Sequence, residues 1–548
     1  MQLIHGAALL DERFQAMKLD VGELRNPEQR VIAREWFTHK KQALLSPHGV
    51  GTVDQGLLSV LNVSHQFVRL WGLANRTVII DEVHAYELYT STLIERFLMW
   101  LRALGSSVIL LSATLPPQVR TRLVTAYGGT LPADDKPYPR ITRVSSQGTR
   151  VEALKARKLS YELHEAPLEI EPLAKLLREL SEGGGAVGCI VNTVDRAQKL
   201  YSALQELPGE AEVRLFHARY PAKQRKDIET WAVDALGKKT PEPRNVILIA
   251  TQVAEQSLDV DFDVLVSDLA PIDLLIQRAG RLHRHDDPMT FQRPRPTKHD
   301  RARLYVSGLA KAAALPDITS YFWHMVYAPA VLLRSWAVLR GRERLTLPDD
   351  LEPLLELVYG NATLPDVSEE FLRALQPTMA KLEEEKAEHE RLARERALAE
   401  PAGFLDALIE DVPYRDDDDP ETNRYLRAAT RLGEPSITVV LLHEKDGKFS
   451  LTADGQTPVD LETKPSFEEA KLLLMHAVSL SNKTVFHALA TPTPEHFPNA
   501  WRESALLRHA RVLKLKDGRC SINDRFAIRL DEGLGVIYER AEGNQGDA

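Results

Sequence analysis

In the first part of the chain, continuous runs of hydrophobic residues alternate with segments in which hydrophobic residues recur at helical spacing. The β-branched run at 77–80 is continuous, as in a strand that is buried on both faces of a parallel sheet. Apolar residues at helical spacing follow over 86–104, and Gly105 predicts the end of that helix. A second continuous apolar run at 108–111 predicts another buried strand. Strand, helix and strand in this order predict a βαβ unit of an α/β fold.

The pattern fades across 131–160, where three prolines crowd a predicted loop, and it resumes after the glycines at 183–185. From there a second α/β unit is predicted, spanning roughly 160–305. Its predicted elements are strands at 188–194, 213–216, 246–249 and 264–266 and a helix at 195–206.

After residue 305 the alternation ends. The aromatic-rich segment 317–340 predicts one helix, and 368–400 predicts a long, highly charged helix. The acidic stretch 416–419 predicts a loop or linker. The remainder, from about 422 to 548, mixes short strands such as 437–442 with helices.

Composition narrows the class of protein. The chain has 548 residues, 44% of them hydrophobic and 27% charged, which suggests about three domains or more and excludes a collagen-like or low-complexity chain. Its two cysteines, Cys189 and Cys520, cannot form a disulfide framework and favour a reducing compartment. The sequence shows neither a secretory signal pattern nor an apolar run of the roughly 18 residues that a membrane span needs, so we predict a cytoplasmic protein.

Asp81 and Glu82 follow the predicted strand at 77–80 directly. They are therefore expected at the carboxyl end of a parallel strand, where α/β proteins bind ligands. In nucleotide hydrolases an aspartate there holds Mg²⁺, and a neighbouring glutamate can orient the attacking water. A solvated acidic turn explains the two residues equally well when they are taken alone.

Polar residues also follow two other predicted strands. Ser112 and Thr114 follow the strand at 108–111, and their hydroxyls could hydrogen-bond the first pair of carboxylates. The segment from Thr251 to Asp259 offers hydroxyl, amide and carboxylate groups after the strand at 246–249. Taken alone, a strand-end turn and a polar loop are the simpler interpretations.

Arg278, Arg281 and Arg284 are spaced three residues apart within the segment that begins at Gln277. On a helix they would share one face, and exposed guanidiniums suit phosphate recognition. An arginine that reaches a γ-phosphate is worth about 10³- to 10⁵-fold in rate. The alternative is a solvated basic helix face.

The order of these segments is more specific than any one of them, because it follows the motif order of superfamily two helicases. The segments are GTVDQ (51–55), IIDEVHAYELYT (79–90), VILLSATLP (108–116), VNTVDRAQKLYSAL (191–204), FHARYPAKQR (216–225), ATQVAEQSLDVDFDVLVSDLAPIDLLIQRAGRLHRH (250–285), ATRLGEPSITVVLL (429–442) and GLGVIYE (533–539). With them the chain closely resembles, over nearly its whole length, the helicase part of the Cas-three family, the helicase–nucleases of type I CRISPR interference.

The resemblance implies an α/β architecture of two RecA-like domains, the first of them incomplete, followed by a helical linker and a small mixed C-terminal accessory domain. The implied boundaries are 1–150 and 151–310 for the RecA-like domains, 311–420 for the linker region and 421–548 for the accessory domain.

The resemblance also implies an ATP site between the two RecA-like domains, with ATP and Mg²⁺ as cofactors. Asp81 would hold the Mg²⁺, Glu82 would position the hydrolytic water, and His84 would communicate across the cleft. Arg281 and Arg284 would be the arginine fingers. The other residues implied at the nucleotide are Ser112, Thr114, Glu255, Gln256, Asp259, Gln277 and Arg278, and the implied DNA contacts are Thr52, Gln55, Asn192, Thr193 and Thr251.

Two parts of that family have no counterpart that we recognise in the sequence. No segment matches the phosphate loop G-x-x-x-x-G-K-[ST], since Gly51–Gly56 has the glycine spacing but continues with two leucines. The H-D pairs at 285–286 and 299–300 lie beyond the arginine motif, so we interpret them as loop residues and not as metal ligands of an HD nuclease. We therefore expect a chain truncated at its N-terminus, with these parts either on a separate partner chain or lost.

The function that the resemblance implies is ATP-dependent translocation on single-stranded DNA in CRISPR antiviral interference, together with an RNA-guided surveillance complex. We expect the isolated chain to be inactive without the phosphate loop and the nuclease. The alternative is a non-catalytic remnant that binds DNA or docks to the complex. A DEAH-like RNA helicase of another pathway is a third interpretation, which the segment 51–55 and the C-terminal segments disfavour.

Local charge supports contact with DNA. The net charge of the chain is −9, so any nucleic-acid binding must come from local basic patches. Residues 277–304 and 502–529 each hold eight Lys or Arg against three Asp or Glu. Phosphate contacts of this kind give the sequence-independent binding that a translocase needs, although solvated basic faces would have the same composition.

Overall fold

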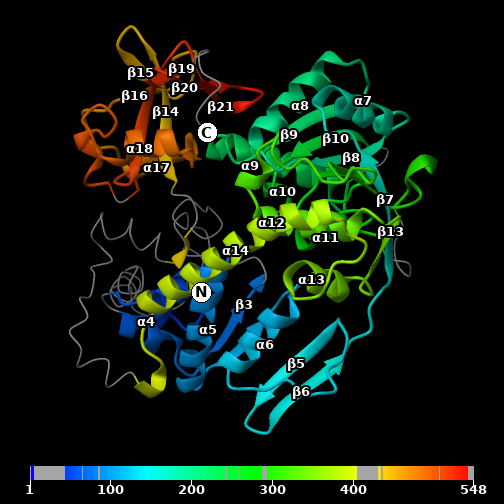
Figure 1. Cartoon of the computed structure of the whole chain (residues 1–548). Coiled ribbons are helices and arrows are strands. Elements are labelled where there is room, and N and C mark those ends of the chain that lie inside the picture. Colours follow the sequence, from blue (N-terminus) through cyan, green and yellow to red (C-terminus); the bar gives the residue numbers. More distant parts are fainter. Residues whose placement is uncertain are drawn as a thin grey trace. The chain divides into compact units, whose positions relative to one another are not determined.

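The chain forms two compact units, and each is described by itself. The first unit comprises Met1–Ala156 with Ala380–Gly433, and the second comprises Arg157–Met379 with Glu434–Ala548. The computed structural model (Figure 1) describes residues 2–4, 43–63, 66–83, 87–240, 244–256, 258–286, 293–403, 430–432, 436–504 and 506–540.

Strands β3 (Thr77–Ile80) and β4 (Ser107–Leu110) of the first unit pair in parallel, with Ile80 opposite Leu110. Helix α5 (Leu88–Ala103) connects them, which confirms the predicted βαβ unit. Helix α5 contributes buried side chains to the hydrophobic core of this unit, among them Leu93, Phe97 and Leu101.

The other elements of the first unit are short. They are β1 (Gln2–Ile4), η2 (Ala43–Leu45), β2 (Gly49–Gly51), α3 (Val53–Leu57), η3 (Leu58–Val60), α4 (Gln66–Leu73), α6 (Pro117–Ala126), β5 (Arg140–Ser145), β6 (Gly148–Ala153) and η7 (Pro401–Gly403).

The prediction that β3 is buried on both faces is wrong. Val78 and Ile80 pack against the core of the unit, but Ile79 between them is 62% exposed, and Ile109 of β4 is exposed as well. In the described part of the unit, β3 and β4 form a sheet of two strands. Because side chains alternate across a strand, the face opposite the core carries apolar residues in contact with solvent.

The loop predicted at the three prolines is present, but the rest of 131–160 contains two strands that the pattern did not predict. Strands β5 and β6 pair there as an antiparallel hairpin, with Ser145 opposite Gly148. Gly148 has a φ of 103°, which glycine adopts without the steric cost that a side chain would bring. The three prolines lie before β5, so they leave the hairpin intact.

The second unit contains a sheet of seven strands among its described residues, in the order β13-β7-β12-β11-β8-β10-β9. All neighbouring strands are parallel except β13, which runs antiparallel to β7. The central strands β8 and β11 are buried along their whole length, as is typical inside a parallel sheet covered on both faces. The strands are β7 (Leu159–Ala166), β8 (Gly185–Ile190), β9 (Glu212–Phe216), β10 (Asn245–Ala250), β11 (Val264–Asp268), β12 (Arg303–Ser307) and β13 (Arg344–Leu347).

Helices connect these strands. Helices α7 and α8 pack on the sheet through a core to which β8, β10 and β11 contribute. The predicted helix at 195–206 begins at Val194, because the Thr193 hydroxyl caps it by accepting a hydrogen bond from the Arg196 N–H at 3.3 Å. The helices are α7 (Ile170–Ser181), α8 (Val194–Glu206), α9 (Ala222–Leu236), α10 (Val253–Gln256), α11 (Ile272–Ala279), α12 (Pro329–Leu339) and α13 (Leu351–Tyr359), with the short η5 (Thr297–His299) and η6 (Trp323–Met325).

Two long helices were predicted after the second sheet, and one is confirmed. Helix α14 (Glu369–Arg396) lies within the predicted range 368–400. The single helix predicted at 317–340 is wrong, because only α12 is an α-helix there. Pro329 is the first residue of α12, where a missing backbone N–H costs nothing.

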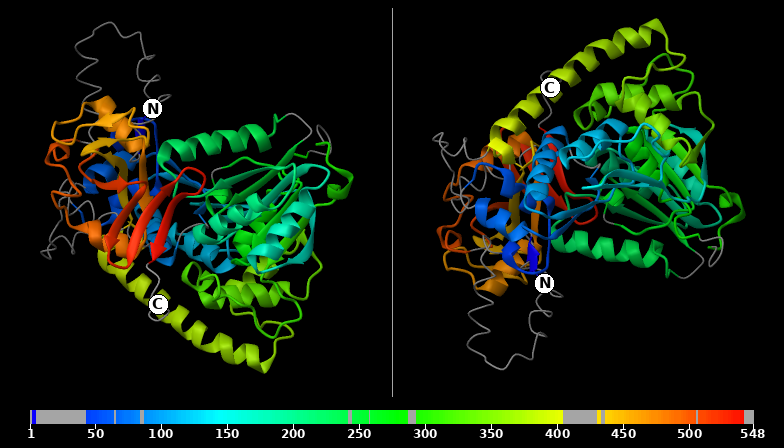
Figure 2. Two further views of the ribbon diagram at one scale, coloured as in Figure 1. Left: turned by 90° about the horizontal axis from the view of Figure 1, so that it is seen from above. Right: turned by 90° about the horizontal axis from the view of Figure 1, so that it is seen from below.

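The last part of the second unit is a mixed α/β domain. Its sheet has the order β16-β15-β14-β18-β19-β20-β21, and β17 also pairs with β14. Figure 2 shows the strands of its C-terminal end side by side in red. The elements are β14 (Ile437–Lys445), β15 (Lys448–Ser450), β16 (Pro458–Val459), α17 (Phe467–Met475), β17 (Ala477–Leu480), α18 (Lys483–Ala490), η8 (Asn499–Trp501), β18 (Ala510–Lys516), β19 (Arg519–Asn523), β20 (Phe526–Asp531) and β21 (Gly535–Arg540).

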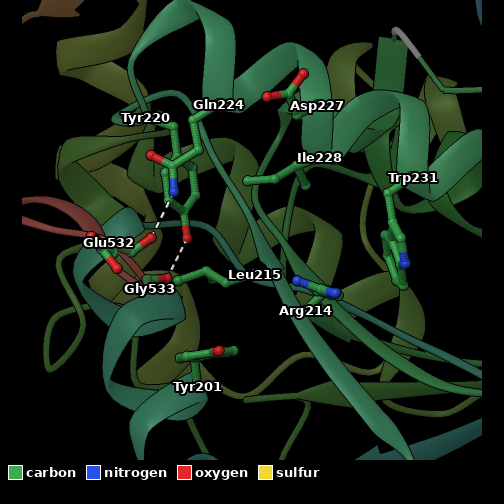
Figure 3. A pocket seen from close by; sticks show the side chains of 10 residues that line it. All are labelled: Tyr201, Arg214, Leu215, Tyr220, Gln224, Asp227, Ile228, Trp231, Glu532 and Gly533. Atoms are coloured by element: carbon green, nitrogen blue, oxygen red, sulfur yellow. Dashed lines mark hydrogen bonds between the residues drawn. The ribbon is translucent and has the colours of Figure 1, made fainter. Parts of the chain in front are cut away.

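The turn between β20 and β21 fastens this domain to the seven-stranded sheet. Side chains from the segment after β9 and from the start of α9 donate hydrogen bonds to successive carbonyl oxygens of the turn, and Figure 3 shows two of these bonds. The bonds run from Gln224 to Glu532 at 2.6 Å, from the Tyr220 hydroxyl to Gly533 at 2.6 Å, and from His217 Nε2 to Leu534 at 3.1 Å. We call this set of contacts the clasp.

Candidate nucleotide and DNA site

Asp81 and Glu82 form a tight turn at the carboxyl end of β3. Both side chains are exposed, and the Glu82 N–H donates to Asp81 Oδ1 at 2.9 Å. The φ of Glu82 is 53°, in the left-handed region that residues with a side chain seldom adopt. Such conformations persist where the surroundings impose them, and they cluster at functional sites.

The backbone brings the second motif beside the first. The Val83 N–H donates to the Leu111 carbonyl at 3.1 Å, and the Leu111 N–H donates to the Ile80 carbonyl at 3.0 Å. Ser112 and Thr114 therefore follow β4 at the sheet edge where Asp81 and Glu82 follow β3. Ser112 is half-buried and Thr114 is buried. His84 lies outside the described residues.

Thr52 and Gln55 lie at the start of α3. Thr52 is exposed and precedes the helix, and its carbonyl accepts a hydrogen bond from the Gln55 N–H at 3.1 Å. Asp54 between them accepts a bidentate pair of hydrogen bonds from Arg431, both at 3.0 Å. The exposed Thr52 hydroxyl is thus on the surface of the first unit, as a contact to a nucleic acid would require.

Arg278 is the centre of the polar network in the second unit. Its guanidinium is fully buried and donates to Glu255 Oε1 at 2.7 Å, to Ser267 Oγ at 2.8 Å and to Asn192 Oδ1 at 3.2 Å. Burial alone would lower the pKa of Arg278, but Glu255, Tyr327 and Asp268 together hold the pKa above its ordinary value. The residue is therefore a permanent cation that joins the ends of β8, β10 and β11.

Two of the predicted DNA contacts are turned inward. Asn192 is buried, and its Nδ2 donates to the Leu269 carbonyl at 2.7 Å. Thr251 is buried as well. Thr193 is half-buried at the start of α8, and Gln252 is half-buried beside it, donating to the Asn192 carbonyl at 2.8 Å. Their roles toward DNA stay a prediction.

The three arginines do not share a helix face, contrary to the prediction. Helix α11 ends at Ala279, and the chain then turns, with the Arg281 N–H bonded to the Arg278 carbonyl at 2.9 Å. The turn continues to His283, whose φ is 49°.

Their exposure also differs from the prediction. Arg281 is buried, and its guanidinium donates to the carbonyls of Leu258 and Glu255. Only Arg284 is exposed, and its Nε donates to Asp259 Oδ1 at 2.9 Å.

The other predicted residues lie around this turn. Glu255 is buried in α10, and Gln277 is half-buried on α11. Asp259 is exposed and also accepts a bond from His285 Nε2 at 3.0 Å. That bond, with a smaller contribution from Arg284, holds the pKa of Asp259 below its ordinary value. Gln256 ends α10, and its side chain is not among the described ones.

Two residues that the sequence analysis missed complete the network. Asp268 ends β11, and its Oδ1 accepts a hydrogen bond from Arg196 Nε at 3.0 Å between fully buried side chains. Burial raises the pKa of Asp268, and the Arg196 charge opposes that rise. A carboxylate directly after a continuous apolar strand was the signal that could have identified it.

No group of three or more His, Cys, Asp or Glu side chains in the described ranges could hold a metal ion. His285 is bonded to Asp259, and His299 Nε2 is bonded to the Leu180 carbonyl at 2.9 Å. A Mg²⁺ that arrives with a nucleotide is a different case, because it needs only one or two carboxylates besides phosphate and water. The exposed Asp81 carboxylate fits that requirement.

A cavity of about 290 Å³ lies beside the clasp, away from every predicted site residue. Figure 3 shows Tyr201, Trp231 and Arg214 around it, together with Gln224 of the clasp. Separately, none of the described helices is both long and apolar enough to cross a membrane.

Comparison with known proteins agrees with this arrangement. The family model described as CRISPR-associated nuclease/helicase Cas3, C-terminal, matches residues 183–287, and the Cas3 C-terminal domain matches 431–536. The CRISPR-associated endonuclease/helicase Cas3 of Thermus thermophilus is 40% identical over 98% of this chain and 62% of its own length. The Cas3 nuclease/helicase of Streptococcus thermophilus is 31% identical over 100% of this chain and 60% of its own.

Solved structures show the same relationship. A CRISPR-associated protein that is 38% identical superposes with a TM-score of 0.80 over 98% of this chain and 60% of that one. T. fusca Cas3 with ATP is 27% identical, with a TM-score of 0.80 over 98% and 61% of the two chains. A structure of a CRISPR RNA-guided surveillance complex, pre-nicking, is 26% identical, with a TM-score of 0.68 over 93% and 63%.

The fold is that of a helicase with RecA-like α/β domains followed by a C-terminal domain, which confirms the predicted fold class. The chain belongs to the Cas3 family of CRISPR-associated nuclease/helicases, the Cas-three family of the sequence analysis. It spans about 60% of the length of the relatives that it matches.

Proposed function

We propose that this chain is the helicase part of an ATP-dependent translocase that moves on single-stranded DNA in type I CRISPR interference. The observation that carries the proposal is the placement of both motif sets at the carboxyl ends of parallel strands, in a chain of the Cas3 family. T. fusca Cas3 structures with ATP, ADP and AMPPNP support ATP as the nucleotide.

In this proposal the first unit binds the nucleotide through the turn after β3. Asp81 would hold Mg²⁺, which would supply charge stabilisation to the phosphates. Glu82, fixed by its unusual backbone conformation, would orient the hydrolytic water. Ser112 and Thr114, on the adjoining turn, would couple this site to contacts with DNA.

The second unit supplies the arginines, and the structure favours different roles for them. Arg284 is exposed and has a single carboxylate, Asp259, as its described side-chain partner, so we assign it to the phosphates. Arg281 is occupied by backbone carbonyls, and we therefore infer that it positions the loop that carries Arg284.

The exposed apolar face of β3 and β4 supports a further part of the proposal. Ile79, Ile109 and Leu111 are exposed there. An exposed apolar face of this kind is normally covered by another segment or another chain. We propose that a segment bearing the phosphate loop, on a partner chain or elsewhere, packs against this sheet. Without that segment we expect the chain to hydrolyse little ATP. In this proposal the HD nuclease would be supplied together with the phosphate loop.

The proposal includes two binding partners, single-stranded DNA and an RNA-guided surveillance complex. The structural likeness to a chain in a CRISPR RNA-guided surveillance complex supports the second. The four-part domain division of the sequence analysis and a cytoplasmic location belong to the same proposal.

The test is ATP hydrolysis by the purified chain, with and without single-stranded DNA, alone and with a fragment that carries a phosphate loop. We expect hydrolysis only when DNA and the fragment are both present. No hydrolysis in any mixture, with DNA binding retained, would contradict the catalytic role and favour a binding or docking module.

A further inference from the structure

Residues 317–327 form an irregular segment between β12 and α12, which we call the Phe322 loop. Its side chains divide into two sets. Trp323 is almost fully buried, whereas Phe322 is 58% exposed and Met325 is 70% exposed. An apolar side chain gains free energy by leaving water, so two large exposed ones in adjoining turns require an explanation.

The loop is rigidly anchored at its start. Asp317 Oδ1 accepts hydrogen bonds from the N–H groups of Thr319 and Ser320, both at 3.0 Å. The Tyr321 ring lies over the Arg196 guanidinium, whose central carbon is 4.0 Å from the ring centroid. This cation–π contact holds the residue that directly precedes Phe322.

The end of the loop is fastened to the helicase motifs themselves. The Tyr327 hydroxyl accepts hydrogen bonds from Gln252 Nε2 at 3.1 Å and from Arg278 Nη2 at 3.2 Å. Gln252 in turn donates to the Asn192 carbonyl. The end of the loop therefore contacts the carboxyl end of the sheet, where Asn192 and Thr193, two of the predicted DNA contacts, also lie.

Phe322 is exposed and has an energetically unfavourable backbone conformation. Its φ is 58° and its ψ is 29°, a left-handed conformation that bulky side chains rarely adopt. Residues on both sides are anchored, so the surrounding structure imposes this conformation. The His324 ring lies beside the Phe322 ring, with 6.3 Å between centroids. The result is a fixed, exposed aromatic surface.

We propose that the Phe322 loop is a base-stacking platform for single-stranded DNA, with the Phe322 ring against a base. This inference rests on the proposed function. Aromatic rings stack on any base, which suits a protein that moves along DNA without reading its sequence. The root of the loop favours DNA over a polypeptide as the occupant, because Gln252 and Arg278 both donate hydrogen bonds to Asn192, one of the predicted DNA contacts.

The experiment measures binding of the full chain to a fluorescent oligothymidylate and to an abasic oligonucleotide of equal length, by anisotropy at low salt. The variants are Phe322→Ala, Phe322→Leu and Phe322→Trp. Phe467→Ala removes an exposed phenylalanine from another surface of the same unit and is the matched control. Thermal unfolding checks that each variant is folded.

We expect Phe322→Ala and Phe322→Leu to weaken binding of the oligothymidylate by about 5- to 150-fold, since stacking on one base is worth that much. Phe322→Trp and Phe467→Ala should stay within about twofold of the wild type, because the first keeps an aromatic face and the second lies elsewhere. On the abasic strand all variants should bind alike.

Three outcomes would overturn the proposal, and they can be told apart. If the wild-type chain binds DNA but Phe322→Ala binds as well as Phe467→Ala does, the platform is wrong and the proposed function stands. If Phe322→Leu retains full binding, the contact is apolar without stacking, which also overturns the platform. If the wild-type chain binds no single-stranded DNA, the proposed function fails and the platform fails with it.

Discussion

The Arg278 guanidinium and the Glu255 carboxylate form an ion pair with 2.6 Å between Nη2 and Oε1, and both side chains are almost wholly buried. The two residues belong to the two most polar motifs of the second unit. The sequence presents both residues as candidates for ligand binding. In the structure they bind each other instead and form a buried contact within the second unit. Arg284 and Asp259, on the loops that follow these motifs, are exposed.

Removal of one partner of this pair should destabilise the second unit strongly. Arg278→Ala leaves the Glu255 carboxylate buried without its cation, so we expect the free energy of unfolding to fall by about 3–5 kcal/mol. Urea-induced unfolding of the full chain measures this change. The control is Arg373→Ala, which breaks an exposed pair with Glu369 and should cost less than about 1 kcal/mol. Equal effects of the two variants would contradict the central role of Arg278.

Substitutions of Arg281 and Arg284 should have different effects, the first on stability and the second on catalysis. Arg281→Ala leaves the Leu258 and Glu255 carbonyls without a donor, so we expect a loss of about 1–3 kcal/mol in unfolding free energy. Arg284→Ala should leave stability within about 0.5 kcal/mol. In the complemented enzyme Arg284→Ala should lower kcat about 10³-fold or more, as for an arginine finger. A normal kcat in Arg284→Ala would refute the assignment to the phosphates.

The clasp should make stability depend on pH through His217. Its Nε2 donates to the Leu534 carbonyl, and its Nδ1 accepts from the Arg219 N–H at 3.1 Å, so the ring is neutral. Burial, followed by the Arg219 charge, lowers the pKa of His217 to about 3. In the unfolded chain the pKa is about 6.5, so between these values only the unfolded state takes up the proton.

The sign of the effect follows from that difference. The stabilisation is complete above pH 6.5 and is lost progressively as the pH falls toward 3. Between pH 7 and pH 5 we expect His217 to account for a loss of about 2 kcal/mol. Urea unfolding at the two pH values, compared between the wild type and His217→Gln, isolates this contribution from that of the carboxylates. An identical pH dependence in the two proteins would show that His217 is not the group responsible.

How far the sequence predicts the structure can be seen from particular residues. The strands at 77–80 and 264–266 were found because a continuous apolar run has few other interpretations. Their burial differs, since the sheet around β11 has neighbours on both sides and the sheet of β3 has one covered face in the described residues. The pattern of apolar residues predicts where a strand lies. It does not predict how many neighbouring strands and helices cover that strand.

The candidate site residues were selected by residue type and order, and their exposure could not be predicted. Arg278, Arg281 and Arg284 have the same chemistry in the sequence, and only the helix end at Ala279 decides which of them is buried. Tyr327 could not be identified, because its role depends on a hydroxyl that reaches across to Gln252 and Arg278. Contacts between distant segments leave no pattern in a single sequence.

The measurement that tests the central claim most directly is ATP hydrolysis by the complemented chain with single-stranded DNA, compared between wild type and Glu82→Gln. This substitution keeps the size of an exposed side chain but removes the carboxylate that would orient the water. We predict DNA-stimulated hydrolysis in the wild type, its loss in Glu82→Gln, and equal DNA binding by both. Hydrolysis that persists in Glu82→Gln would contradict the site, and its absence from the complemented wild type would contradict the proposed function.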